Sequence, residues 1–192
     1  NYFGNIKAMS IASLAGTVVI LALSTFIVKL ASKIGKKELS MIGCFISAAS
    51  FILLFIIHTH NVLVWVGLII VATIGTSMFN MVIWAMITDV IDESEVQTGV
   101  RQDGTIYSVY SFARKLGQAC SSGLSVLLSI IGYTSVTAFD PKVVDGIYNI
   151  TCLVPAGGMI LLLLALWFLY PLNKKRVEEN AEKLRIKRNE NA

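Results

Sequence analysis

The sequence is poor in charged residues. Asp, Glu, Lys and Arg make up 15% of its 192 residues, whereas hydrophobic residues make up 55% and the mean hydropathy is +0.72. Because soluble domains carry about one quarter charged residues, this composition indicates a membrane protein.

The sequence also lacks the short motifs of catalysis and of metal binding. Cys44, Cys120 and Cys152 lie in apolar segments without C-x-x-C spacing, and we interpret them as small hydrophobic residues. No H-E-x-x-H motif, phosphate-binding loop or nucleophile–base pair occurs. The basic runs contain no interleaved aromatic residues, which argues against nucleic-acid binding. We therefore expect no enzyme, no nucleic-acid partner, no resident metal and no cofactor.

Long apolar stretches are what the sequence does have. About 20 apolar residues cross the roughly 30 Å of hydrocarbon in a bilayer. Five stretches reach that length, so we predict an all-α transmembrane domain over residues 1–172 and a solvated tail with one helix at 173–192. The chain begins at Asn1 without an initiator Met, so we expect a longer protein in which residues 1–5 end a preceding span. The complete predicted spans are 9–31, 39–59, 62–88, 105–133 and 147–170.

Lysine and arginine predict the orientation of these spans. The connection at 33–37 is rich in lysine, and the tail is dense in Lys and Arg from 174 to 188. Positively charged connections stay on the cytoplasmic side. We therefore expect a multi-pass protein of the plasma membrane with a cytoplasmic tail. Parity places the acidic loop expected at 89–103 on the same side.

Two spans have a polar face. Polar residues recur at intervals of three and four on the span 62–88, and on 105–133 they fall within less than half of the helical circumference. Arg114 and Lys115 lie near the predicted midplane, where a cation costs about 2.5–3.5 kcal/mol on insertion scales. Lipid cannot satisfy such a face, so it must meet protein or water. We predict a substrate cavity lined by Asn80, Trp84, Tyr107, Tyr110, Arg114, Lys115 and Gln118.

These side chains suit a polyhydroxylated ligand. Aromatic faces cover the C–H side of a sugar ring, while guanidinium and amide groups pair with its hydroxyls. The same set also suits an anionic head group, with Arg114 and Lys115 as counter-charges.

Small and hydroxyl residues in the first two spans have a simpler interpretation. Such residues let membrane helices approach closely, so we expect helix packing and not ligand binding there. The residues concerned are Ser10, Ser13 and Thr17 in the first span and Ser40, Gly43, Ser47 and Ser50 in the second.

Asp89, Asp92 and Arg101 are predicted to form a cytoplasmic gate. The two aspartates are three residues apart at the end of the third span. Arg101 lies where the chain re-enters the next span, so it can pair with either. Such ion pairs hold one access state closed and break in the other.

The segment 84–119 resembles a known family. It reads W-A-M-x-x-D-x-x-D from Trp84, followed by T-G-V-R, G-x-x-Y-S and R-K-L-G-Q-A. It is similar to the glycoside–pentoside–hexuronide cation symporters, a group of the major facilitator type that includes the melibiose carrier. The sequence departs from that family at 93–96, where E-S-E-V replaces the usual Y-G-E-W. Gly35–Lys37 also resembles the basic loop between helices of major facilitator proteins.

The resemblance implies the second six-helix half of a twelve-span secondary transporter. A glycoside, pentoside or hexuronide would move with a coupling cation by alternating access. Lys115 would lie near the sugar and cation region, and Tyr, Trp and Asn positions of the two polar spans would line the cavity. No Asp or Glu lies deep within a span, so the coupling Na⁺, H⁺ or Li⁺ would be bound mostly by the N-terminal half. The implied partners are the sugar, the cation, membrane lipids and that N-terminal half.

Two other functions remain open at this point. A carrier of amphiphiles or lysolipids with the same fold would show an open lateral groove and no glycoside binding. A non-transporting membrane protein, structural or receptor-like, would show no ligand-dependent thermal shift with any small solute.

Overall fold

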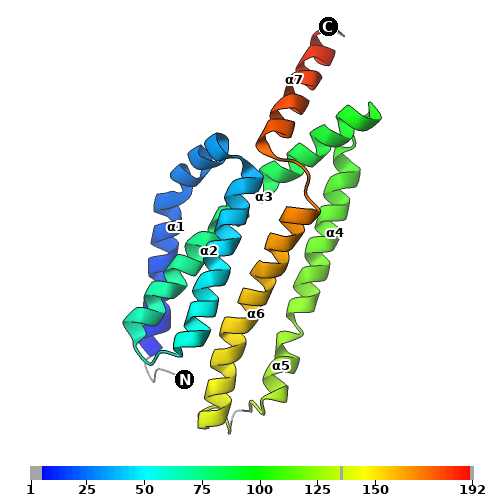
Figure 1. Ribbon diagram of the computed structural model, residues 1–192. Coiled ribbons are helices and arrows are strands. Elements are labelled where there is room, and N and C mark those ends of the chain that lie inside the picture. The colour runs from blue at the N-terminus through cyan, green and yellow to red at the C-terminus, as the bar shows by residue number, and fades with distance from the viewer. Residues whose placement is uncertain (1–5, 135, 191–192) are drawn as a thin grey trace.

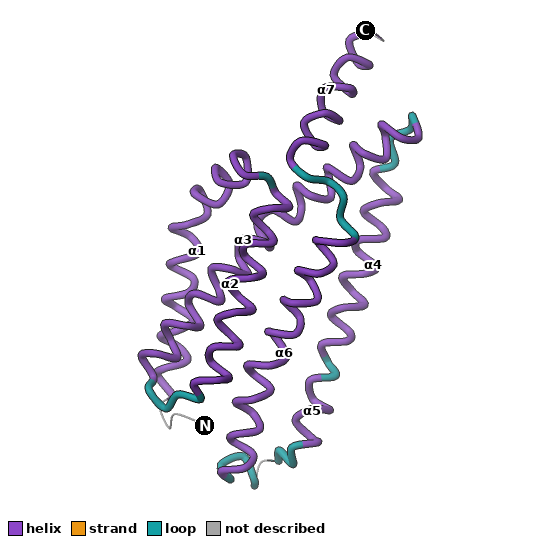
Figure 2. Tube along the Cα trace, viewed as in Figure 1, coloured by secondary structure: helices purple, strands orange, loops and turns teal. Residues whose placement is uncertain are grey.

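The computed structural model of the protein describes residues 6–134 and 136–190, with side chains from Leu14 onward except that of Ala15. Every regular element in this part is a helix (Figures 1 and 2), which confirms the all-α prediction. The expected end of a preceding span at 1–5 and the expected packing of Ser10 and Ser13 lie outside the described residues and side chains. The helices are α1 (Ile6–Ile34), α2 (Lys36–Ile57), α3 (Val62–Thr98), α4 (Asp103–Ser121), α5 (Leu124–Ile130), α6 (Pro141–Phe168) and α7 (Lys174–Glu190).

Four helical segments among the described residues are long and apolar enough to cross a membrane. They are Gly16–Ile34 of α1 and the whole of α2, α3 and α6. Large apolar side chains point outward from them, for example Phe26 and Leu161, which are 70% and 69% exposed. An outer surface of this kind suits lipid and indicates a multi-pass membrane protein.

The stretch expected to form the fourth span, 105–133, differs from the prediction. It is divided into α4 and α5, and α4 is not among the described helices that are apolar enough to cross by themselves. The division falls at Ser122–Gly123, where the backbone N–H groups of both residues bond to the carbonyl three residues earlier. Serine and glycine are weak helix formers, and the Ser121 hydroxyl donates to the Gln118 carbonyl at 2.6 Å. The helix that carries the polar face is therefore interrupted between α4 and α5.

The loop expected at 89–103 is mostly helical. Helix α3 has 37 residues, about 56 Å at 1.5 Å per residue, which is far longer than the hydrocarbon layer is thick. Its last ten residues, Asp89–Thr98, are hereafter the polar extension of α3. Gly99 ends the helix in a left-handed conformation, with φ of 77°, and its N–H donates to the Glu95 carbonyl. Only residues 99–102 connect α3 to α4.

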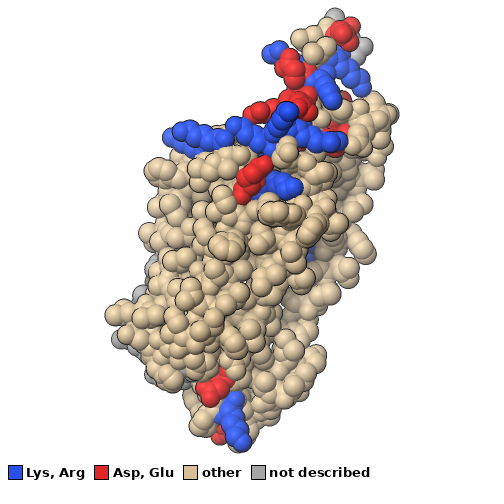
Figure 3. Space-filling model, in the orientation of Figure 1, with Lys and Arg blue, Asp and Glu red and all other residues tan. Residues whose placement is uncertain are grey.

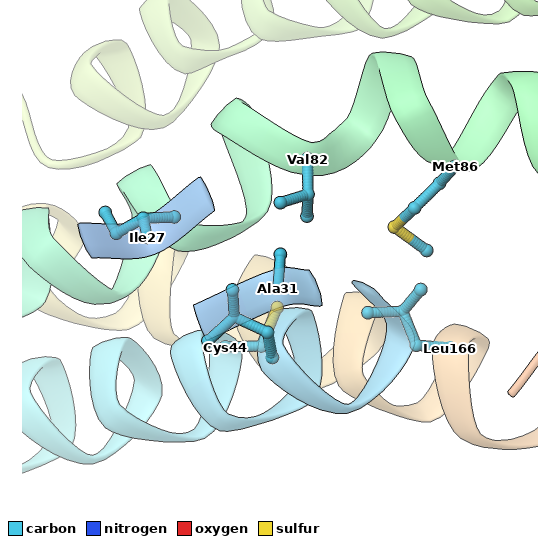
Figure 4. Packing of buried hydrophobic residues seen from close by; sticks show 7 residues of the cluster. Ile27, Ala31, Cys44, Val82, Met86 and Leu166 are labelled. Atoms are coloured by element: carbon cyan, nitrogen blue, oxygen red, sulfur yellow. The ribbon is translucent and has the colours of Figure 1, made fainter. Parts of the chain in front are cut away.

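Helix α2 lies in the middle of the bundle. It packs against α3 and α6, and α1 packs against α3. The main apolar cluster joins all four helices, and Figure 4 shows how its side chains converge. Its buried members are Ile27 and Ala31 of α1, Leu39 and Cys44 of α2, Val82 and Met86 of α3, and Leu166 of α6.

Helices α2 and α3 approach most closely at two glycines. A Cβ placed on Gly43 would collide with the carbonyl oxygen of Gly75, and the reverse holds for Gly75. One turn away, the hydroxyls of Ser47 and Thr76 lie 3.0 Å apart. The helix-packing interpretation is thus confirmed for Gly43 and Ser47.

Helices α4 and α5 contribute little to this core. Neither has a buried residue in the described part of the chain, and α4 contacts α3. In Figure 1 the two run in succession along the side of the bundle. Both the polar and the apolar face of α4 are therefore open.

Most charged residues gather at one end of the bundle, and a smaller group lies at the opposite end (Figure 3). The more highly charged end combines the turn at 33–37, the polar extension of α3 and helix α7 (Figure 1). The lysine pattern assigns the turn and the tail to one side of the membrane, and parity of the predicted spans assigns the acidic segment to the same side. That this side is the cytoplasm stays a prediction.

Candidate functional site

An aromatic–cation cluster, made of Trp84, Tyr107, Tyr110 and Arg114, lies between α3 and α4. The Trp84 ring centroid is 6.4 Å from that of Tyr107 and 5.3 Å from that of Tyr110, which it meets edge-on at 69°. The guanidinium carbon of Arg114 is 5.9 Å from the Trp84 ring centroid, within cation–π distance. Four of the seven predicted substrate-binding residues therefore meet in one place.

Helix periodicity and a short connection produce this cluster. Tyr107, Tyr110 and Arg114 are spaced by three and four residues, so they share one face of α4. The connection at 99–102 is short enough to return α4 alongside α3, as in an antiparallel helix pair. Trp84, 48% exposed, then faces the aromatic side of α4.

Asn80, Lys115 and Gln118 lie outside the cluster. All three are exposed, and none makes a side-chain hydrogen bond or ring contact with the cluster in the described part of the chain. Asn80 precedes Trp84 by one helical turn and Gln118 follows Arg114 by one turn, so each extends the same face. Neither Arg114 nor Lys115 forms an ion pair with any described carboxylate.

The polar face predicted for the third span is only partly exposed. The Thr76 hydroxyl pairs with Ser47 of α2, and Ser77 is buried with its hydroxyl on the Thr73 carbonyl. Thr76 and Ser77 thus pack helices together. The open part of the face begins at Asn80 and includes Trp84.

Arg101 lies at the centre of an acidic cluster. Its Nη1 is 2.9 Å from Asp92 Oδ1 and 3.0 Å from Glu95 Oε2, and its Nε is 2.9 Å from Asp103 Oδ2. Hydrogen bonds to Glu95, Asp92 and Asp103 raise the pKa of Arg101 further above its ordinary value. We call these four residues the Arg101 cluster. Of the two predicted partners, Asp92 is the one that pairs with Arg101.

Asp89 pairs with Lys36 and not with Arg101. Its Oδ1 accepts a hydrogen bond of 2.6 Å from Lys36 Nζ, which also donates to the Ala85 carbonyl at 3.3 Å. Because α3 stays helical to Thr98, Asp89 lies about 15 Å along the axis from Gly99 and meets the lysine-rich turn instead. Asp89 is 5% exposed, and its Oδ2 has no hydrogen-bond partner among the described residues.

Glu93 is a residue that sequence reasoning missed. It is 9% exposed and accepts hydrogen bonds from Gln97 at 2.5 Å, from Asn180 at 2.5 Å and from Arg176, whose Nε is 3.1 Å from both oxygens. Contact with this carboxylate raises the pKa of Arg176. Spacing was the available signal, because Glu93 follows Asp89 by four residues and so shares its inward face.

The arrangement suits binding and conformational change. It offers aromatic rings, two cations that pair with no carboxylate among the described residues, and a set of ion pairs at one end of the helices. Within the described residues no group of three or more His, Cys, Asp or Glu side chains could hold a metal ion.

The comparison with known proteins now identifies the family. Residues 1–174 match the family described as MFS/sugar transport protein. The chain belongs to this family. The resemblance read from the segment 84–119, to cation symporters of the major facilitator type, is thereby confirmed.

The relatives of this MFS chain are transporters by name. A glucuronide carrier protein homolog of Escherichia coli is 33% identical over 170 residues, which cover 88% of this chain and 36% of the relative. A putative sulfoquinovose importer of Salmonella typhimurium is 32% identical over 156 residues, 79% of this chain and 33% of the relative. A sodium-dependent lysophosphatidylcholine symporter of Gallus gallus is 28% identical over 162 residues, which cover 83% of this chain and 30% of the relative. The chain thus spans about one third of the length of the curated relatives it matches, and these relatives are named as carriers, importers and symporters and not as enzymes.

Proposed function

We propose that this chain is the second six-helix half of a sugar–cation symporter that works by alternating access. The observation that carries the proposal is the aromatic–cation cluster on an exposed polar helix face, in a member of the MFS/sugar transport family. In this proposal α3 and α4 form one wall of a sugar site, and the facing wall belongs to the N-terminal half.

The polar face of α4 supports a cavity. Arg114 and Lys115 are exposed near the middle of the stretch that runs from Asp103 to Ile130. Hydrocarbon cannot solvate two such cations, so the face must meet water or protein. In this proposal the Trp84 ring covers the C–H side of a sugar, and the amides of Asn80 and Gln118, each one turn further along its helix face, pair with hydroxyl groups.

The charge of the site favours an acidic sugar. Arg114 and Lys115 have no acidic partner in the described part of the chain, so a substrate carboxylate can accept hydrogen bonds from both. Glucuronide, which is named for one of the relatives, is such an acidic sugar. We therefore propose hexuronides ahead of neutral glycosides and pentosides as substrates.

The remaining parts of the proposal concern the charged end. We propose that this end faces the cytoplasm of a plasma-membrane transporter, and that Asp89, Asp92 and Arg101 help to close it. The coupling cation, Na⁺, H⁺ or Li⁺, would bind mostly to the N-terminal half, because Asp89 is the first acidic residue along α3 and already lies at its charged end. Surrounding lipids complete the set of partners.

Uptake by the full-length transporter in proteoliposomes tests the function. We expect labelled glucuronide to accumulate only under an inward gradient of Na⁺, Li⁺ or H⁺. Hydrogen bonds to charged groups contribute about 1.5–3 kcal/mol, so Arg114→Ala and Lys115→Ala should each weaken apparent affinity by about 10-fold to 100-fold. Lys142→Gln, at the exposed start of α6, is the matched control and should leave uptake unchanged. Gradient-independent uptake would refute symport, and full uptake by both alanine variants would make the polar face structural.

A lysolipid carrier is the second candidate. The apolar face of α4 is open beside its cations, with Phe112 and Leu116 exposed by 69% and 55%, so it could take a lipid chain next to a head group. The lysophosphatidylcholine symporter among the relatives supports this reading. A competition experiment distinguishes the two candidates, because excess lysophosphatidylcholine should not inhibit uptake of labelled glucuronide if the site takes sugars. A protein with no transport role would show no thermal shift with either ligand.

A further inference from the structure

Helix α7 is docked on the polar extension of α3 and is not the freely solvated tail that the sequence suggests (Figure 1). Arg176 holds the Glu93 carboxylate through Nε and Nη2, and Asn180 donates to it from the next turn. Asn180 and Leu184 are each 4% exposed, so one side of α7 is buried. Because an amide and a carboxylate are buried between α7 and α3, α7 has one defined position on α3.

The far end of α7 reaches the connection between α3 and α4. Lys187 Nζ donates to the Gly99 carbonyl at 3.1 Å, and Arg188 Nη2 is 3.6 Å from Glu95 Oε2. That same carboxylate oxygen is 3.0 Å from Arg101 Nη1. One oxygen is thus shared between α7 and the Arg101 cluster, which couples the seat of α7 to the ion pairs at the end of α3.

Helix α7 begins where the family match ends. The family match ends at residue 174, where α7 begins. The contacts with Glu93 and Glu95 therefore come from a segment that lies almost wholly outside the matched region. Other charges of α7 pair within the helix, as Lys175 does with Glu179 and Arg185 with Glu182, and Lys174 donates to the Lys33 carbonyl at 2.8 Å.

We propose that α7 acts as a latch: docked on the polar extension of α3, it holds the side chains of the Arg101 cluster in place. Glu93 is the positioning residue that keeps α7 docked. Its effect on uptake rests on the proposed transport function, whereas the docking itself does not. Glu93 follows Trp84 by nine residues, about 14 Å along the helix, so its loss should spare substrate binding. Releasing the latch should therefore change the maximal rate of uptake and leave the substrate Kd unchanged.

Limited proteolysis tests the docking without reference to transport. Lysyl endopeptidase cleaves after Lys183, an exposed residue within α7 that none of the variants alters. In the full-length transporter, Glu93→Gln and Arg176→Gln should each speed this cleavage by about tenfold, because the rate follows the population of the undocked helix. Glu179→Gln is the matched control: its carboxylate pairs with Lys175 inside α7, so the cleavage rate should stay at the wild-type value.

Charge exchange and kinetics test the positioning role. The double variant Glu93→Arg/Arg176→Glu should regain at least half of the wild-type protection, which neither single reversal would do. In proteoliposomes, Glu93→Gln should change the maximal uptake rate at least twofold at constant Kd. Wild-type cleavage rates in both single glutamine variants would overturn the latch. Faster cleavage with unchanged maximal uptake would overturn the positioning role, and a wild-type protein that moves no sugar would refute the proposed function while the cleavage result still stands.

Discussion

Replacing Lys36 by Met should isolate a buried carboxylate. The side chain of Asp89 is 6% exposed and that of Lys36 is 31% exposed, and their ion pair of 2.6 Å joins the lysine-rich turn to α3. Without Lys36, Asp89 Oδ1 loses its ammonium partner, and Oδ2 has no hydrogen-bond partner among the described residues. Removing one member of a buried pair costs about 3–5 kcal/mol, so we expect Lys36→Met to be strongly destabilising.

The double variant Lys36→Met/Asp89→Leu separates the cost of the isolated charge from the value of the pair. Replacing a whole buried pair by apolar residues is often neutral or stabilising, by about 1–4 kcal/mol. We therefore expect the double variant to recover most of the stability that the single variant loses. The coupling energy between the two positions should be large and favourable, which means that the double variant loses much less stability than the two single variants together.

Thermal unfolding of the full-length transporter in detergent, followed by tryptophan fluorescence, is the assay. Lys36→Met should lower Tm by several degrees, and the double variant should return it close to the wild-type value. Lys33→Met is the matched control, since Lys33 is exposed in the same turn and its side chain forms no ion pair with a described carboxylate. Equal Tm values for the wild type and Lys36→Met, or additive losses in the double variant, would refute the reasoning.

Two further changes test the packing of the bundle by the same assay. Gly43→Ala drives a methyl group into the carbonyl of Gly75 and should cost about 1–3 kcal/mol, whereas Gly67→Ala, with open space around it, should be close to neutral. Tyr148→Phe removes a buried hydrogen bond of 2.8 Å to the Leu54 carbonyl and should cost about 1 kcal/mol. A Gly43→Ala protein as stable as the Gly67→Ala control would contradict the close crossing. An unchanged Tm in Tyr148→Phe would mean that the hydroxyl contributes nothing to the contact between α2 and α6.

Local spacing accounts for what could be predicted at the site. Tyr107, Tyr110 and Arg114 repeat at three and four residues, so any α-helix places them on one face, and a short connection brings them to Trp84. The sequence left two candidate partners for Arg101, namely Asp89 and Asp92. Choosing between them required knowing that α3 continues for ten residues beyond the apolar span.

The sequence by itself determined the helical class, the membrane character and the family. Each of these depends on residues close together in the chain: apolar runs, helical periodicity and the motif from Trp84 to Ala119. Only the tertiary structure decided which charges pair. Lys36 meets Asp89 across 53 residues, and Arg176 meets Glu93 across 83, and no local pattern specifies contacts that depend on where whole helices pack. The structure likewise decided that the tail is docked, because the seat of α7 exists only once α3 extends beyond the apolar bundle.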